Sequence, residues 1–176
     1  MGRVYSSHNL GSQQSSGKIL RSVIDEVAEL EPGDGLLFLI TGPVGSGKSS
    51  LVRELTRVLP GWSGIRVSAL SWLAGNEGEL LAHILERADH EGTLTELADR
   101  EGVRTAVIID DVHWADATSL RELIDTTRRL RKGRLAVIMT ASDRDDAADH
   151  LPMSHLRELA DLAVTAQRWC DQATAA

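Results

Sequence analysis

The glycine-rich stretch "TGPVGSGKSSL", residues 41–51, constrains the fold more than any other feature of the chain. Gly42, Gly47, Lys48 and Ser49 have the spacing of a phosphate-binding loop: a glycine, four residues of any type, then Gly-Lys-Ser. Such a loop follows a buried strand and opens a helix. The apolar run "LLFLI" precedes it, and apolar residues at helical spacing follow it. A chance glycine turn would need neither neighbour, so we expect an α/β fold.

Each residue type in this loop has a physical role. Glycines let backbone N–H groups approach phosphate oxygens, and the helix that begins near Gly47 directs free N–H groups and its positive dipole end at the same anion. Lys48 is expected to contact the β and γ phosphates, and the Ser49 hydroxyl to bind Mg²⁺. The predicted nucleotide-binding residues are Gly42, Pro43, Val44, Gly45, Ser46, Gly47, Lys48, Ser49 and Ser50, with Asp110 from a later strand.

A second acidic element is needed to hold the metal, and "AVIIDDVHWAD", residues 106–116, is the best candidate. Its apolar run ends in two carboxylates. Asp110, at the end of the strand, is predicted to bind Mg²⁺ together with Ser49. Asp111 is predicted to orient or deprotonate the attacking water. Two solvated acids at a strand end are the alternative.

The rest of the chain alternates strand and helix patterns. Strands are predicted at 36–40, 65–70, 105–110 and 135–142, and helices at 18–30, 51–59 and 117–131, with one or two more between 77 and 101. Residues 162–167 are predicted as a fifth strand after a short helix, with a continuous helix as the alternative. Such alternation favours a mostly parallel sheet. We expect a flexible leader over 1–17, the domain over 18–170 and a tail over 171–176.

Composition limits the function classes. The 176 residues suffice for one domain, and a formal net charge of −7 argues against a sequence-independent nucleic-acid binder. The basic cluster at 128–134 is interpreted as the cationic end of a helix, so no direct DNA binding is expected. A single cysteine excludes an intrachain disulfide. There is no secretory leader and no apolar stretch of membrane-spanning length, so a cytoplasmic protein that does not insert into membranes is expected.

The segment "DDVHWADATSL", residues 110–120, resembles the one that follows the Walker B strand in the ATP-binding domains of large LuxR-type transcriptional regulators. A similar sequence occurs in related AAA-like and STAND-type signalling ATPases. The resemblance covers residues 35–145. It implies a three-layer P-loop NTPase fold with strand order 5-1-4-3-2, ATP and Mg²⁺ as ligands, and nucleotide-driven switching.

The resemblance also suggests further site residues. Thr140 and Ser142 lie where related ATPases place a polar sensor of the γ-phosphate. Arg144 matches the arginine that commonly follows this strand, and it is included with Asp111 and Lys48 as a catalytic candidate. A surface arginine is the alternative. His113 and Trp114 either touch nucleotide or a neighbouring subunit, or pack the next helix against the sheet.

The chain departs from the family pattern in three ways. It lacks the "Gly-Arg-Glu" box ahead of the first helix, and Asp111 stands where faster ATPases often carry glutamate, which implies slow turnover. The helical lid and the DNA-binding helix-turn-helix of the family do not follow within the chain. We therefore expect the lid domain to be absent, and leave open whether this is an N-terminal fragment, whether it lacks C-terminal domains and whether it self-associates.

Three function classes are compatible with the sequence. The preferred one is an ATP-binding, slowly hydrolysing, Mg²⁺-dependent switch domain. A P-loop kinase of small molecules and a nucleotide-binding module without catalysis are the alternatives. No guanine-reading motif is present, so ATP is expected to bind better than GTP, with its base against the helix of 18–30 and the turn of 31–35.

Overall fold

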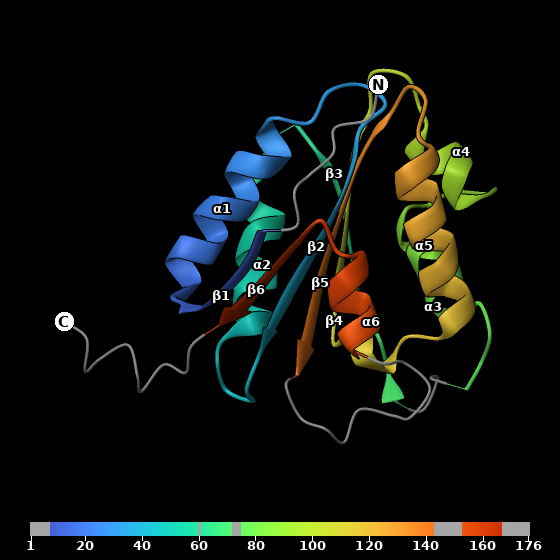
Figure 1. The fold of residues 1–176 in the computed structure, drawn as a ribbon. Coiled ribbons are helices and arrows are strands. Elements are labelled where there is room, and N and C mark those ends of the chain that lie inside the picture. Colours follow the sequence, from blue (N-terminus) through green and yellow to red (C-terminus); the bar gives the residue numbers. More distant parts are fainter. Residues whose placement is uncertain (1–7, 60, 72–74, 143–152, 167–176) are drawn as a thin grey trace.

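The computed structural model describes residues 8–59, 61–71, 75–142 and 153–166 (Figure 1). Its centre is a six-stranded sheet in the order β1-β6-β2-β5-β4-β3. Every pairing among these strands is parallel. The strands are β1 (His8–Gln14), β2 (Gly35–Gly42), β3 (Ser63–Ser68), β4 (Arg104–Asp110), β5 (Arg134–Ser142) and β6 (Leu162–Ala166).

The predicted strand order is confirmed. Counted from β2, which leads into the glycine-rich loop, the five core strands lie in the order 5-1-4-3-2, with β5 between β2 and β4. The tail forms a short helix, α6 (Met153–Leu159), and then strand β6, as preferred from the sequence. In β6 buried and half-buried residues alternate, and Leu162 to Thr165 align with Phe38 to Thr41 of β2. This period of two is the pattern of a strand.

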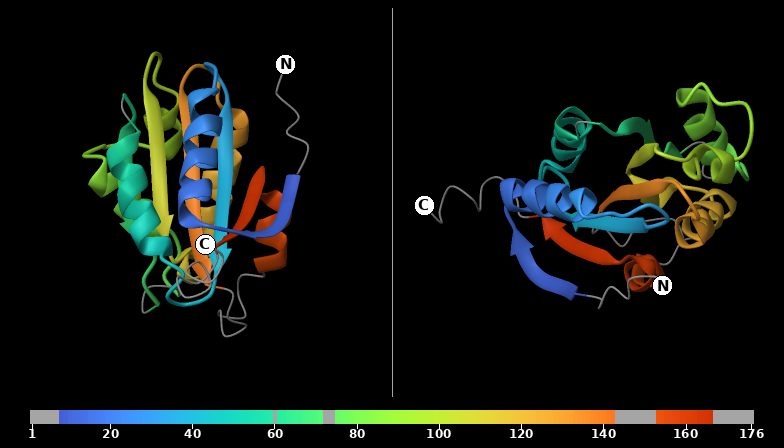
Figure 2. Two further views of the ribbon diagram at one scale, coloured as in Figure 1. Left: turned by 90° about the vertical axis from the view of Figure 1, so that its left-hand side faces the viewer. Right: turned by 90° about the horizontal axis from the view of Figure 1, so that it is seen from above.

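Helices cover both faces of the sheet, which makes three layers (Figure 2). On one face lie α1 (Ser16–Ala28) and α2 (Lys48–Val58), packed on alternate strand residues such as Phe38 and Ile108. On the other lie α3 (Glu79–Arg87), α4 (Leu94–Ala98) and α5 (Ala117–Arg129), packed on Leu39 and Ile109. The central strands are apolar on both sides because both are buried. No helix among the described residues is long and apolar enough to span a bilayer.

The N-terminal segment differs from the sequence prediction. Residues His8–Gln14 form strand β1, paired in parallel with β6, and α1 begins at Ser16. The prediction of a flexible leader is therefore wrong for these residues. The outer edge of β6 offers unpaired backbone N–H and C=O groups, and a strand pairs with them through its own backbone, so polar side chains do not prevent it. Residues 1–7 of the predicted leader and the predicted tail at 171–176 lie outside the described residues.

Candidate functional site

The site lies at the carboxyl ends of the central strands. β2 ends in the glycine-rich loop, and the adjacent β5 carries Thr140 opposite Ile40. β4, on the other side of β5, ends at Asp110. In open parallel sheets this edge is where ligands bind. The fold therefore brings together the two motifs that the sequence singled out, which are separated by about sixty residues in the chain.

The backbone of the loop depends on glycine. Gly45 and Gly47 have φ angles of 82° and 87°, and Gly42 has a φ of 154°. A Cβ on Gly42 would lie 2.8 Å from the carbonyl oxygen of Ala166 and 3.0 Å from Ser46 Oγ. A Cβ on Gly45 would meet nothing within 4 Å. Gly42 is thus required by close packing against β6, whereas Gly45 is required only by its dihedral angle.

Helix α2 presents its amino end to this loop. Its N-cap residue is Gly47, which has no side chain to accept from the first-turn N–H groups, and the first intrahelical bond runs from Leu51 N to Gly47 O at 2.9 Å. Ser49 and Ser50 in this turn are exposed. A helix amino end of this kind attracts anions through its N–H groups and its dipole. The geometry suits phosphate oxygens.

Lys48 is held over the loop by oxygen atoms of the loop itself. Only 8% of Lys48 is exposed, and its Nζ donates to the carbonyl oxygens of Gly42 at 2.8 Å and Pro43 at 3.0 Å. Ser46 Oγ lies 3.4 Å from the same nitrogen. Phosphate oxygens form stronger hydrogen bonds with an ammonium group than neutral oxygens do. The ammonium group is therefore positioned for an anion at the loop.

Thr140 links the two acidic residues. Its Oγ1 donates to Asp110 Oδ1 at 2.5 Å and accepts from the backbone N–H of Asp111 at 3.1 Å. Asp110 is 6% exposed, so this bond fixes a carboxylate with little access to water. The family resemblance places both Thr140 and Ser142 where related ATPases have a polar sensor of the γ-phosphate. The hydroxyl of Thr140 already forms hydrogen bonds with Asp110 and Asp111. Ser142, which is aligned with Gly42 of β2, has a buried Oγ without a hydrogen-bond partner among the described residues.

Asp111 occupies a left-handed backbone conformation, with a φ of 56°, between β4 and the short helix η2 (Val112–Trp114). Burial raises the pKa of Asp111, and the neighbouring charge of Asp110 raises it further, while His113 and Lys48 act in the opposite direction. A carboxylate with a raised pKa accepts a proton more readily than an ordinary aspartate. The structure thus gives the two adjacent acids different surroundings.

His113 and Trp114 pack against each other in η2. Their ring centroids are 5.1 Å apart with planes tilted by 46°, and His113 is buried. Burial lowers the pKa of His113, as does the charge of Lys48, against the effect of Asp111. These observations support the packing interpretation. Contact with a nucleotide or another subunit stays a prediction.

Asp116 connects two helices to the segment that follows β4. Its Oδ1 accepts from the N–H groups of Ser119 at 2.8 Å and Gly78 at 2.9 Å, and its Oδ2 accepts from Leu80 N at 3.2 Å. Burial alone would raise the pKa of Asp116, but these N–H groups hold it below its usual range. Asp116 is thus the N-cap residue of α5. The bonds to the start of α3 were not foreseen.

The donor set is suitable for Mg²⁺. Ser49 and Asp110 supply oxygen atoms, which Mg²⁺ prefers, and it commonly keeps phosphate oxygens and waters as its other ligands. In the part of the chain that the structure describes, no group of three or more histidine, cysteine, aspartate or glutamate residues forms a metal cluster. Arg144 lies outside the described residues.

One expectation about the base is wrong. The turn of residues 31–35 precedes β2, whereas the glycine-rich loop follows it. An eight-residue strand separates them, and the seven steps between its first and last residues correspond to about 23 Å at roughly 3.3 Å per step. A nucleotide with its phosphates on the loop does not reach that turn. The amino-terminal part of α1 lies at the same end as the loop, because α1 runs antiparallel to β2 (Figure 1).

The sequence matches the AAA ATPase domain family over residues 17–138, more than half of the chain. A search of curated proteins found no match.

Solved structures of several P-loop ATPases share the fold. The ORC2 protein of Aeropyrum pernix, in complexes with ADPNP and ADP, is 16% identical with a TM-score of 0.62, covering 86% of this chain and 46% of that one. PCH-2 of C. elegans is 20% identical with a TM-score of 0.56, covering 88% and 43%. A RuvB variant of Thermotoga maritima is 18% identical with a TM-score of 0.52, covering 85% and 43%. The chain spans less than half the length of each, and at these identities the likeness concerns the fold alone.

Proposed function

The chain belongs to the AAA ATPase domain family, and we propose that it acts there as a slowly hydrolysing, Mg²⁺-dependent ATP switch of a signalling or transcription-regulating ATPase. A P-loop domain of this type binds ATP. The observation that carries the proposal is the bridge made by Thr140, which holds Asp110 and the backbone of Asp111 in one arrangement beside the loop that positions Lys48.

The proposed roles follow from the surroundings of each group. Lys48 and the first turn of α2 bind the phosphates, and Ser49 and Asp110 hold Mg²⁺, which when bound neutralises phosphate charge. Asp111, whose pKa burial raises, holds the attacking water and accepts its proton. Ser142 offers an unused hydroxyl near Gly42 for the terminal phosphate. We also propose that Arg144 contacts that phosphate.

The switch role, as opposed to fast metabolic catalysis, is supported by the identity of residue 111. Aspartate is one methylene shorter than glutamate, so its carboxylate reaches a water less well from the same backbone position. The regulator assignment is supported by the segment of residues 110–120, which resembles LuxR-type regulators and STAND-type ATPases. Self-association, or C-terminal domains of a longer protein, would then transmit the nucleotide state.

The test measures ATP affinity with and without Mg²⁺ and phosphate release for four proteins. Asp111→Asn should keep the fold and ATP binding but lose turnover. Asp110→Asn should make binding less dependent on Mg²⁺, because it removes a metal ligand. Asp125→Asn is the matched control, since Asp125 lies on α5 and pairs with Arg129 at 3.6 Å.

Each alternative has its own result in this experiment. If Asp111→Asn releases phosphate as fast as the parent, the role of Asp111 is wrong. If the parent binds ATP but releases no phosphate under any condition, the domain is a nucleotide-binding module without catalysis. If phosphate appears on an added small-molecule acceptor instead of in solution, the kinase alternative is correct.

A further inference from the structure

The β3 edge of the sheet has backbone groups without a strand partner. Among the described residues β3 pairs only with β4, at the opposite edge from β1. Ala69 N donates to Asp110 O at 2.9 Å, which shows which residues of this segment face β4. Because alternate residues of a parallel strand face the same neighbour, Gly64, Arg66 and Ser68 direct their N–H and C=O groups away from the sheet.

A groove of about 1050 Å³ runs along this edge. One wall is β3, from Gly64 to Ser68, continued by Leu70, and the other is formed by His83, Glu86 and Arg87 of α3. The exposed backbone groups of β3 therefore line a concavity, whereas a flat or convex edge would give a peptide only one surface to contact. Such an edge beside a helix is where extended peptides add to a sheet in known recognition modes.

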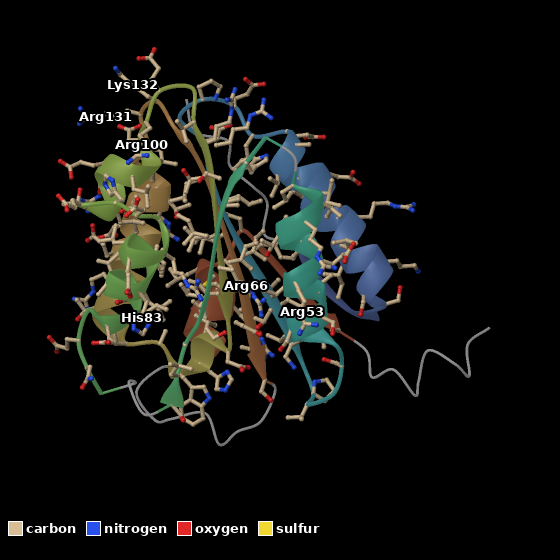
Figure 3. All side chains as sticks on the ribbon, turned by 180° about the vertical axis from the view of Figure 1, so that it is seen from behind. Arg53, Arg66, His83, Arg100, Arg131 and Lys132 are labelled. Atoms are coloured by element: carbon tan, nitrogen blue, oxygen red, sulfur yellow. The ribbon has the colours of Figure 1, made fainter. Side chains whose placement is uncertain are left out.

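The β3 edge carries arginines although the chain is acidic overall. Arg66 and Arg87 line the groove against the acid Glu86, while the whole chain carries a formal charge of −7. His83 also lines it, with its Nε2 3.4 Å from Glu79 Oε1. Figure 3, which views this side of the molecule, labels Arg66 on β3, His83 on α3 and Arg53 on α2.

Arg66 carries a buried donor that the described structure does not use. Its Nε has no hydrogen-bond partner among the described residues. Its neighbours Ile65 and Val67 are buried in the cluster that includes α3, so the Arg66 side chain lies on the opposite face, on the side of α2. Arginines therefore lie on both faces of the edge: Arg66 and Arg53 on one, and Arg87 on the other (Figure 3).

We propose that this edge binds an extended acidic segment of a partner protein, which adds to the sheet beside β3. A strand matches alternating N–H and C=O groups, and nucleic acid does not. Its side chains alternate between faces, so acidic residues on both faces would meet the cations there. A pairing of β3 with β3 of a second copy that is centred on Arg66 is disfavoured, because it would bring arginine against arginine.

The experiment uses a fluorescein-labelled peptide of repeating Glu-Glu-Thr-Thr, in which glutamates occur on both faces of a strand. Fluorescence anisotropy with the full chain should show binding that Arg66→Glu and Arg87→Glu each weaken by about tenfold or more. Arg21→Glu makes the same charge change at an exposed position of α1 and should leave the affinity unchanged. Circular dichroism checks that each variant is folded.

Two further measurements separate strand addition from general charge attraction. The same peptide with backbone N-methyl groups should bind at least about tenfold more weakly. Hydrogen exchange should slow at the amides of Arg66 and Ser68, which face outward, more than at Ile65 and Val67, which already pair with β4. Binding by Lys48→Ala should equal that of the parent, so the result is independent of the proposed ATPase role.

Four results would each overturn the proposal. They are equal binding of the N-methylated peptide, equal binding of a version with lysine for glutamate, tighter binding of single-stranded oligothymidylate, and self-association that Arg66→Glu abolishes. The third would assign the groove to nucleic acid and the fourth to a second copy of this chain. Absence of peptide binding to the parent would also refute it.

Discussion

The bonds made by Asp116 lead to the most discriminating experiment on this fold. Only 4% of Asp116 is exposed, and its carboxylate accepts three backbone N–H groups, from Ser119 at the start of α5 and from Gly78 and Leu80 at the start of α3. Substitution by alanine removes all three acceptors. Substitution by asparagine keeps one carbonyl oxygen and replaces the other by a donor that faces an N–H group.

The expected cost follows from these contacts. A hydrogen bond to a charged group contributes roughly 1.5–3 kcal/mol, and a lost N-cap costs about 1 kcal/mol. The three bonds share one carboxylate and are not additive, so Asp116→Ala should cost about 3–5 kcal/mol and Asp116→Asn about 1–2 kcal/mol. Against a typical total of roughly 5–15 kcal/mol, the alanine variant would be close to unfolding.

Urea unfolding followed by tryptophan fluorescence measures this cost, and ATP affinity is measured alongside it. Asp99 is the matched control, because it accepts from the backbone N–H groups of Arg131, Lys132 and Gly133 at the opposite end of the sheet. Asp99→Asn should lower stability and leave ATP affinity unchanged. Asp116→Asn should lower both, since Asp116 anchors the segment that carries Asp111.

The pH dependence gives an independent check. The pKa of Asp116 is held below its usual range, so the folded state binds this proton less readily than the unfolded chain. The stabilisation is therefore complete above the unfolded pKa, near ~3.9, and is lost as pH falls below it. The stability difference between parent and Asp116→Asn should shrink in that range. An unchanged urea midpoint at neutral pH, or a difference that grows on acidification, would refute the reasoning.

Three other substitutions have defined outcomes. Lys48→Ala should weaken ATP binding by roughly 1.5–3 kcal/mol in titration calorimetry, because one charge-assisted contact is lost; unchanged affinity would contradict this. Gly42→Ala should destabilise the fold by about 1–3 kcal/mol in thermal unfolding, because the new Cβ would lie 2.8 Å from Ala166 O. Gly45→Ala should destabilise it less, because a Cβ there meets nothing within 4 Å. Burial raises the pKa of Asp161, whose Oδ2 accepts from Leu37 N at 2.7 Å, a bond that an amide oxygen can also accept. Asp161→Asn should therefore increase stability at neutral pH in urea unfolding, and the gain should disappear as pH falls through the folded pKa; a loss of stability at neutral pH would contradict this.

The parts of the fold that could be predicted from sequence are those with a side-chain signature. The three central strands β2, β4 and β5 are buried on both faces, so the sequence of each contains an unbroken apolar run. The order of the strands in the sheet followed from the family resemblance. The loop around Lys48 and the acids at 110 and 111 are recognisable because their chemistry requires particular residue types at particular spacings.

The parts that could not be predicted depend on backbone or distant contacts. β1 pairs through its backbone with β6, at the other end of the chain, and its polar sequence carries no strand signal. The second role of Asp116 depends on Gly78, 38 residues earlier. Thr140 was noted as polar at a strand end, but its bond to Asp110 depends on the alignment of two strands. The base does not lie at the turn of 31–35, because β2 runs from that turn to the loop and keeps the two apart.

The left-handed backbone at Asp111 has a consequence for how this site tolerates change. Glycine adopts a φ of 56° without strain, whereas a residue with a Cβ does so at a cost, which is smaller for aspartate than for most side chains. Asp111→Gly would then relax the backbone while removing the carboxylate. In a random library screened only for thermal resistance, glycine should be enriched at this position, and in one screened for phosphate release it should be lost. The position is thus one where selection for stability and selection for turnover would choose different residues.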